Sequence, residues 1–213
     1  MDGTTITGYH TTHIDNLKSI LENGFLMSKP NANHWLGKGV YFFKDIYYAE
    51  EWKIIGVAKR YRLDEKNGID NSCIVVAEIN CEEFEMVDFS TPTGYEIFKT
   101  FLDVLKEEFT EEEYKEILRK GNHYIIKMLE KLETVKDKKI LSLFDIVCAD
   151  FHKNMGIAKN DLKQKSNFLS VVQKQICVKN IKAIKGIYKL NETNEHKRML
   201  EIVRANRRDK NDK

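Results

Sequence analysis

The sequence predicts a single α+β domain, and three observations support this prediction. Residues 5–9 form a strand-like stretch that is followed at once by an amphipathic segment ending at Gly24. Residues 95–136 are dense in Glu, Lys and Leu with a helical period, and the β-branched segments 169–178 and 183–190 follow as strands. At 213 residues, the chain is long enough for one domain of this kind to bury a hydrophobic core.

The composition is that of a globular protein. Hydrophobic residues make up 42% of the chain and charged residues 32%, which argues against an intrinsically disordered chain. The net charge of +2 does not require a nucleic-acid partner. The polar N-terminal residues lack the pattern of a secretory signal, and no apolar run is long enough to cross a bilayer. We therefore expect a cytoplasmic protein with no membrane partner.

The four cysteines lack the spacing of a zinc site or of a disulfide framework. Three of them, Cys73, Cys148 and Cys177, lie inside apolar runs, where a buried thiol is the usual interpretation. We expect no metal site in this chain.

The first quarter of the chain predicts the order strand, helix, strand, helix. The first strand ends at His10, Asp15 is the expected N-cap of the helix, and Gly24 ends that helix in the left-handed conformation that glycine favours. The segment HWLGKGVYFF at residues 34–43 predicts an aromatic strand. A second helix is predicted from Asp45 to Tyr61, with Asp45 as its N-cap.

The middle of the chain predicts a helical insertion between sheet strands. Residues 73–79 predict a strand, and residues 84–89 predict a shorter one. Residues 90–136 then predict two or three charged helices, with capping-box spacing from Thr110 to Glu113. Its charges are typical of solvated helix faces.

The last part of the chain is predicted less completely. The apolar residues 139–151 fit either a helix or a strand, and residues 152–168 are polar and loop-like. We expect one domain over residues 1–190, with the insertion at about 90–136, and a charged, partly helical C-terminal tail at 191–213.

Five residues together predict a slot for a flat polar ring. His10 lies at a strand end, and Gly37 and Gly39 permit a close approach to the backbone because glycine has no side chain. Tyr41 and Trp52 supply two aromatic rings. With backbone amides as hydrogen-bond donors, such a slot suits nicotinamide. Each residue alone also fits a structural role, as a buried histidine, a turn glycine or a core aromatic.

The same segments resemble the ADP-ribosyltransferase superfamily, on the side of the poly-ADP-ribose polymerase and diphtheria-toxin-like enzymes. GYHTT, NLKSILENGF and GKGVYFFKDIYYAEEW resemble the first two motifs of that family, and the resemblance resumes at residues 171–190. It implies a split, mixed or antiparallel β-sheet core with flanking helices.

The resemblance also implies roles for single residues. His10 would bind the adenosine ribose hydroxyls of NAD, the backbone of Thr11 would meet the nicotinamide carboxamide, and Tyr41 and Trp52 would enclose the nicotinamide ring. The implied cofactor-binding residues are His10, Thr11, Thr12, Gly37, Gly39, Tyr41 and Trp52. The chain departs from the family's usual residues at Thr11, where glycine is usual, at Ala49 (serine) and at Trp52 (tyrosine).

Gln175 lies where the family has a catalytic glutamate, and Gln173 lies two residues earlier on the same strand face. The implied catalytic residues are therefore His10, Tyr41 and Gln175, with Gln173 as a substrate-binding residue. A glutamine can hydrogen-bond a ribose hydroxyl, but it carries no charge and cannot act as a general base. Single transfer is expected rather than chain elongation.

The function implied is an NAD-dependent mono-ADP-ribosyltransferase that modifies an intracellular macromolecule, either a protein or a nucleic acid. We expect NAD as co-substrate, and a toxin of a toxin–antitoxin or phage-defence system with an antitoxin or inhibitor as a further partner. Two alternatives stay open. One is a catalytically degenerate module that binds NAD or ADP-ribose. The other is an NAD-dependent RNA phosphotransferase, which is disfavoured because the sequence places no arginine set around His10.

Further charged residues are candidates for handling the two substrates. Three lysines could guide the NAD pyrophosphate or a nucleic-acid acceptor, and three carboxylates could activate an acceptor if the fold brings one near. These residues are Lys38, Lys44 and Lys53 and, for the carboxylates, Glu50, Glu51 and Asp150.

Overall fold

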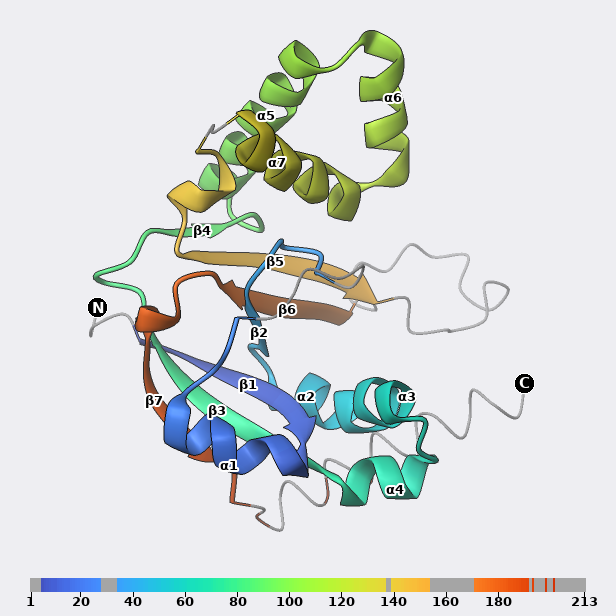
Figure 1. The fold of residues 1–213 in the computed structure, drawn as a ribbon, viewed down its shortest axis with the longest axis vertical. Coiled ribbons are helices and arrows are strands. Elements are labelled where there is room, and N and C mark those ends of the chain that lie inside the picture. Colours follow the sequence, from blue (N-terminus) through green and yellow to red (C-terminus); the bar gives the residue numbers. More distant parts are fainter. Residues whose placement is uncertain are drawn as a thin grey trace.

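Seven strands of the described chain form one mixed sheet in the computed structural model, with helices around it (Figure 1). The structure describes residues 5–27, 34–136, 139–153 and 171–191, together with Thr193, Arg198 and Glu201. The strand order across the sheet is β4-β5-β6-β2-β1-β3-β7, in which β4 and β5 are parallel and the other neighbours are antiparallel. The prediction of an α+β fold with flanking helices is confirmed.

The elements follow one another in a simple order. The strands are β1 (Thr5–His13), β2 (Val40–Phe43), β3 (Ser72–Asn80), β4 (Met86–Asp88), β5 (Ile146–Lys153), β6 (Val171–Val178) and β7 (Ile184–Lys189). The helices are α1 (Ile14–Asn23), α2 (Ile46–Trp52), α3 (Ala58–Tyr61), α4 (Glu65–Asp70), α5 (Pro92–Glu108), α6 (Glu111–Lys120) and α7 (Asn122–Lys136). A π-helical segment, Lys53–Val57, joins α2 to α3, and short 3-10 helices lie at Leu141–Leu143 and Ile181–Ala183.

The sheet is nearly divided in two between β1 and β2. Within the described chain, Tyr9 and Phe43 form the single recorded pair between these strands. On their other sides the same strands are fully paired, β1 with β3 over all its residues and β2 with β6 over all of its own. We call β4-β5-β6-β2 the outer half-sheet and β1-β3-β7 the inner half-sheet.

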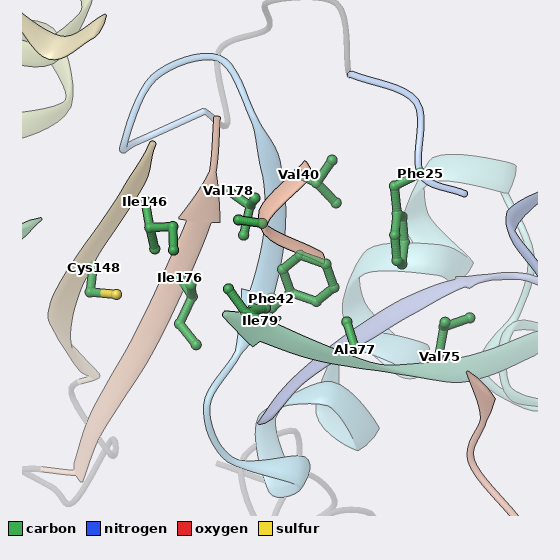
Figure 2. Packing of buried hydrophobic residues seen from close by; sticks show 11 residues of the cluster. Phe25, Val40, Phe42, Val75, Ala77, Ile79, Ile146, Cys148, Ile176 and Val178 are labelled. Carbon is green, nitrogen blue, oxygen red and sulfur yellow. The ribbon is translucent and has the colours of Figure 1, made fainter. Parts of the chain in front are cut away.

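One hydrophobic core covers both halves on the same side of the sheet. It contains Phe42 of β2, which is 1% exposed, and we call this side the Phe42 face. Figure 2 shows Phe25, which follows α1, together with members from both half-sheets, namely Val40, Phe42, Val75, Ala77, Ile79, Ile146, Cys148, Ile176 and Val178. Leu17 and Ile20 of α1 pack against this core. The two halves are thus joined by burial of apolar surface rather than by backbone pairing.

The opposite side of the sheet carries Tyr41 and Phe43, and we call it the Tyr41 face. Helix α2 covers its centre, where Tyr48 and Ala49 pack with Phe43 and with Ile74 of β3. Further out, Tyr41 packs with a smaller apolar cluster of the outer half-sheet. The Tyr41 face is therefore shared between α2 and residues next to the insertion.

Helices α5, α6 and α7 form the predicted insertion, and they pack together beyond the β4–β5 edge of the sheet (Figure 1). The insertion has its own apolar cluster, in which Leu105 and Leu129 are fully buried. The predicted capping box is present, because Thr110 and Glu113 exchange hydrogen bonds at the start of α6. Helix α6 ends at Gly121, whose φ is +85°.

Several local predictions need correction. His13, not Asp15, is the N-cap of α1: its side chain accepts from the N–H of Asp15, because β1 runs three residues past His10. The helix predicted from Asp45 to Tyr61 is a short helix, a π-helical segment and a further turn, although Asp45 is its N-cap as predicted.

Some predictions for the later part of the chain need correction, and others fall on residues that the structure does not describe. Residues 65–70 form α4, a helix that was not predicted. The ambiguous residues 139–151 contain a 3-10 turn and most of strand β5. The strand predicted from residue 169 is described from Val171 onward. Most of the loop predicted at 152–168 and most of the tail predicted at 191–213 lie outside the described residues.

Replacement of Leu129 by alanine is expected to lower the free energy of unfolding by about 2–5 kcal/mol, because Leu129 is fully buried in the core of the insertion and its loss leaves a cavity. Val135→Ala is the matched control on the same helix, since Val135 is 70% exposed and should change stability by less than about 0.5 kcal/mol. Urea denaturation of both variants tests this, and similar losses in the two would contradict the separate core.

Candidate active site

Recorded pairing between β1 and β2 stops before Thr11, and we call the stretch without recorded pairs between these two strands the gap. Lys44 donates its N–H to Lys174 of β6, and successive residues of a strand direct their peptide groups to opposite neighbours. Phe43 therefore faces β1, where it pairs with Tyr9. Thr11 lies two residues beyond Tyr9 and directs its N–H and C=O to the same side. Within the described chain no β2 residue is recorded as pairing with Thr11, so these two groups face the gap.

His10 holds the other edge of the gap through its side chain. Its Nδ1 lies 2.8 Å from the carbonyl oxygen of Tyr41, and because a carbonyl can only accept, Nδ1 carries the proton. Burial lowers the pKa of His10, and the nearby charge of Arg60 lowers it further. The ring packs edge-on against Phe25 and Phe42. The neutral ring thus leaves Nε2 as a hydrogen-bond acceptor, and the described residues give Nε2 no recorded partner.

Tyr41 is fixed by the glycine loop that precedes it. Its hydroxyl donates to the carbonyl of Gly37 and accepts from the N–H of Leu36, both at 2.7 Å. Its ring stacks on the ring of His34 at 5.3 Å between centroids. Burial raises the pKa of Tyr41, so the phenol is neutral at physiological pH. The hydroxyl is used within the protein and one face of the ring lies on His34, which leaves the rest of the ring to contact a ligand.

The two glutamines lie on the Tyr41 face of β6. Gln175 is directly opposite Phe43 of β2, and Gln173 follows with the period of two. Tyr41 is opposite Cys177 on the same face. Both glutamines are half-buried. The structure therefore places Gln173, Gln175 and Tyr41 on one side of the sheet.

Trp52 lies over Phe43 at the end of α2. Its indole is 6.0 Å from the Phe43 ring and 37% exposed. A β-carbon at Gly56 would lie 2.2 Å from the indole ring, so Gly56 is needed for the ring to lie across the π-helical turn. Among the described residues no ring contact joins Trp52 to Tyr41. Trp52 contacts Phe43, which lies two residues after Tyr41 on the same face of β2.

The hydroxyls of Thr11 and Thr12 are used inside the protein. Thr11 Oγ1 donates to the carbonyl of Ala49 at 2.5 Å, which ties β1 to α2. Thr12 Oγ1 accepts from the side chain of Asn16 at 3.0 Å. These two residues can therefore offer a ligand backbone groups rather than hydroxyls.

Gly37 and Gly39 allow other parts of the protein to approach the loop. Gly37 has a φ of +87°, and a β-carbon there would lie 2.4 Å from Glu130 Oε1 and 2.6 Å from Lys179 Nζ. A β-carbon at Gly39 would lie 2.4 Å from Cys177 Sγ. The close approach to this backbone, expected of a ligand, is made by the chain itself. The assignment of Gly37 and Gly39 to cofactor binding stays a prediction.

The other charged candidates divide into buried and exposed groups. Lys53 and Glu50 form an ion pair at 3.2 Å, and each side chain is no more than 3% exposed. Glu51 is also buried. These three side chains are withdrawn from solvent, and they are poorly placed to meet an acceptor.

Lys38 and Lys44, in contrast, are exposed. Asp150 pairs with Lys174 at 3.4 Å, and Lys174 also binds Asp88 at 2.7 Å. Asp150 therefore has a cationic partner within the outer half-sheet, whereas Lys38 and Lys44 remain available to a phosphate.

Two residues near the gap were not identified from the sequence. Arg60 of α3 is close enough to His10 and His34 that its charge lowers the pKa of both, after burial. His34 stacks on Tyr41. Neither has a motif that would have revealed it. Helix α3 meets the end of β1, where Tyr61 lies against His13, and this contact between residues distant in sequence brings Arg60 toward His10.

The described residues contain no group of three His, Cys, Asp or Glu side chains that could hold a metal ion. None of the helices that the structure describes is both long and apolar enough to cross a membrane.

The chain is similar to MJ0359 of Methanocaldococcus jannaschii, which is described as an uncharacterized protein. The two are 27% identical over 202 residues, which cover 88% of this chain and 89% of the relative. The similarity thus covers most of both chains, but the description of the relative assigns it no activity. No family model matches the chain. No solved structure matches it either.

The lowered pKa of His10 predicts a pH-dependent stability. Between that lowered pKa and the ordinary value of 6.5, the unfolded chain binds a proton that the folded chain does not, so stability rises with pH across this window. The free energy of unfolding is therefore expected to fall between about pH 7.5 and about pH 5 by more in the parent than in His10→Asn, whose amide can still donate to Tyr41. His34 is common to both chains and cancels. An equal fall in both, measured by urea denaturation, would refute the assignment.

Proposed function

We propose that this protein is an NAD-dependent mono-ADP-ribosyltransferase whose NAD lies in the gap between β1 and β2. The observation that carries the proposal is the peptide group of Thr11, which faces the gap and has no recorded partner in β2 within the described chain. An N–H and a C=O side by side are complementary to a carboxamide, which has one acceptor and one donor group. Thr11 would bind the nicotinamide carboxamide through this pair of hydrogen bonds.

Aromatic side chains on the Tyr41 face supply the surface for the nicotinamide ring. Tyr41 presents its ring because its hydroxyl is held by Leu36 and Gly37. Trp52 and Phe43 lie at the α2 side of the same face. Stacking between aromatic rings contributes about 0.5–1.5 kcal/mol per pair, so these rings would add orientation as well as affinity.

His10 and Arg60 are suited to the other half of NAD. The neutral His10 has Nε2 as an acceptor, which fits a ribose hydroxyl. Arg60 is exposed, and the described chain records no carboxylate partner for it. A guanidinium in this position fits the pyrophosphate. The exposed Lys38 and Lys44, at the two ends of β2, are assigned to a nucleic-acid acceptor.

The reaction would break the bond between the nicotinamide nitrogen and C1′ of the ribose. Nicotinamide leaves with the bonding electron pair, positive charge develops on the ribose, and a nucleophile of the acceptor bonds to C1′ and loses its proton to solvent. Gln175 can hydrogen-bond a ribose hydroxyl during this step, but it cannot stabilise the positive charge as a carboxylate would. We therefore propose slow, single transfer.

The acceptor is an intracellular protein or nucleic acid in this proposal, and the chain acts in the cytoplasm. A toxin or phage-defence protein with an inhibitor partner remains the proposed setting. Gln175 favours a second candidate, a module that binds NAD or ADP-ribose without turnover, because the residue lacks the charge that the chemistry uses.

Incubation with adenylate-labelled NAD in a cell extract, followed by separation of protein, RNA and DNA, tests the proposal. We expect label in one fraction, no label with Tyr41→Ala, and about 100- to 1,000-fold faster transfer with Gln175→Glu, because a carboxylate restores the stabilising charge. Val172→Glu is the matched control, since it adds the same charge to β6 at an exposed position on the opposite face of the sheet.

Equal rates for the parent and Gln175→Glu would overturn the catalytic placement of Gln175. NAD binding without transfer in either chain would favour the binding module. Phosphate transfer to RNA without the adenylate label would favour the phosphotransferase.

A further inference from the structure

The helical insertion reaches the candidate active site through one side chain, Glu130 of α7. Glu130 Oε1 accepts the backbone N–H of Lys38 at 2.5 Å, across 92 positions of sequence. The same oxygen lies 3.6 Å from Lys179 Nζ, and the two side chains are 27% and 13% exposed. An ion pair this well covered is screened less by solvent than a surface pair.

The contact between Glu130 and the loop requires glycine at position 37. A β-carbon there would lie within 3 Å of both Glu130 Oε1 and Lys179 Nζ, so the absence of a side chain lets both groups lie over the backbone. The loop is held from the sheet side as well, where Cys177 Sγ lies 3.8 Å from the carbonyl of Gly37. The segment is therefore fixed from the insertion and from β6.

The held segment is the one that orients Tyr41. The carbonyl of Gly37 and the N–H of Leu36 bind the Tyr41 hydroxyl at 2.7 Å each. Movement of residues 36–38 would therefore rotate or release the phenol ring. The negative charge of Glu130 also contributes to the raised pKa of Tyr41, after burial and the nearby Cys177, which agrees with its closeness to that ring.

We propose that Glu130 is a positioning residue through which the helical insertion sets the ring of Tyr41. This inference rests on the proposed function, because it assigns Tyr41 to the nicotinamide. In this proposal the insertion takes part in the site, because α7 supplies the carboxylate that binds the backbone N–H of Lys38. Glu130 does not touch the substrate and acts through Lys38, Gly37 and Tyr41 in turn.

A cavity of about 380 Å³ lies beside this contact, between α7 and the sheet, and is lined by Lys38, Glu130, Glu133, Lys179 and other residues. The side chain of Glu130 is thus reached by solvent on one side. Its replacement can be accommodated without filling or opening the buried core of the insertion, which is made by other residues of α7.

The test compares Glu130→Ala and Glu130→Gln with Glu112→Ala, which removes an exposed carboxylate of α6. Two quantities are measured on the full chain: the exchange rate of the Lys38 amide hydrogen by NMR, and kcat for nicotinamide release. In Glu130→Ala we expect Lys38 exchange to rise by about tenfold or more and kcat to fall by about tenfold. Glu130→Gln should restore part of both, because its amide oxygen can still accept from Lys38.

Binding of ADP-ribose separates positioning from general damage. ADP-ribose lacks nicotinamide, so its dissociation constant should stay within about twofold of the parent in Glu130→Ala. Parent-like Lys38 exchange, parent-like kcat or an equal loss of ADP-ribose binding in Glu130→Ala would each overturn the proposal. A parent chain that binds NAD but releases no nicotinamide would overturn the proposed transfer activity and this role with it. The exchange rates would then still report whether Glu130 holds the loop.

Discussion

The hydrogen bond from His10 Nδ1 to the carbonyl of Tyr41 replaces a backbone pair between β1 and β2. Beyond the Tyr9–Phe43 pair, the peptide groups of Tyr41 and Thr11 would otherwise be the next to meet. A side chain satisfies the Tyr41 carbonyl instead, and the gap stays open beside Thr11. The shared core of the Phe42 face keeps the two half-sheets together despite this break. The site depends on both: the core fixes the halves, and the imidazole fixes the distance between their edges.

Much of this fold could be predicted from the sequence. The strands at β1, β3 and β7 and the capping box of α6 follow from local patterns, because the residues that produce them lie within a few positions of one another. The end of α1 at Gly24 is also local. The prediction of His10, Tyr41 and Gln175 as a group came from a resemblance rather than from spacing. The structure places Tyr41 and Gln175 on one face, with His10 bound to the backbone of Tyr41.

The features that escaped prediction depend on contacts distant in sequence. Nothing in the sequence near Gly37 indicates that the lack of a side chain there makes room for Glu130 of α7 and for Lys179, which follows β6. Arg60 likewise gains its relation to His10 from the packing of α3. The apolar residues 139–151 were ambiguous because a buried strand and a buried helix have similar composition, and pairing of β5 with β6 decides between them.

The strand order has a consequence for how the site comes into being during synthesis. β1 pairs with β3, whose residues end at Asn80, whereas β2 pairs with β6, whose residues end at Val178. A growing chain can therefore pair β1 with β3 long before β2 has a partner, although β7 joins β3 only after β6 has been made. The edge that bears Tyr41 and the strand that bears Gln175 enter the fold together and late. A growing chain that lacks β6 would already contain His10 and Thr11 but would have no partner for β2, so any activity that resides at the gap would begin only after β6 has been made.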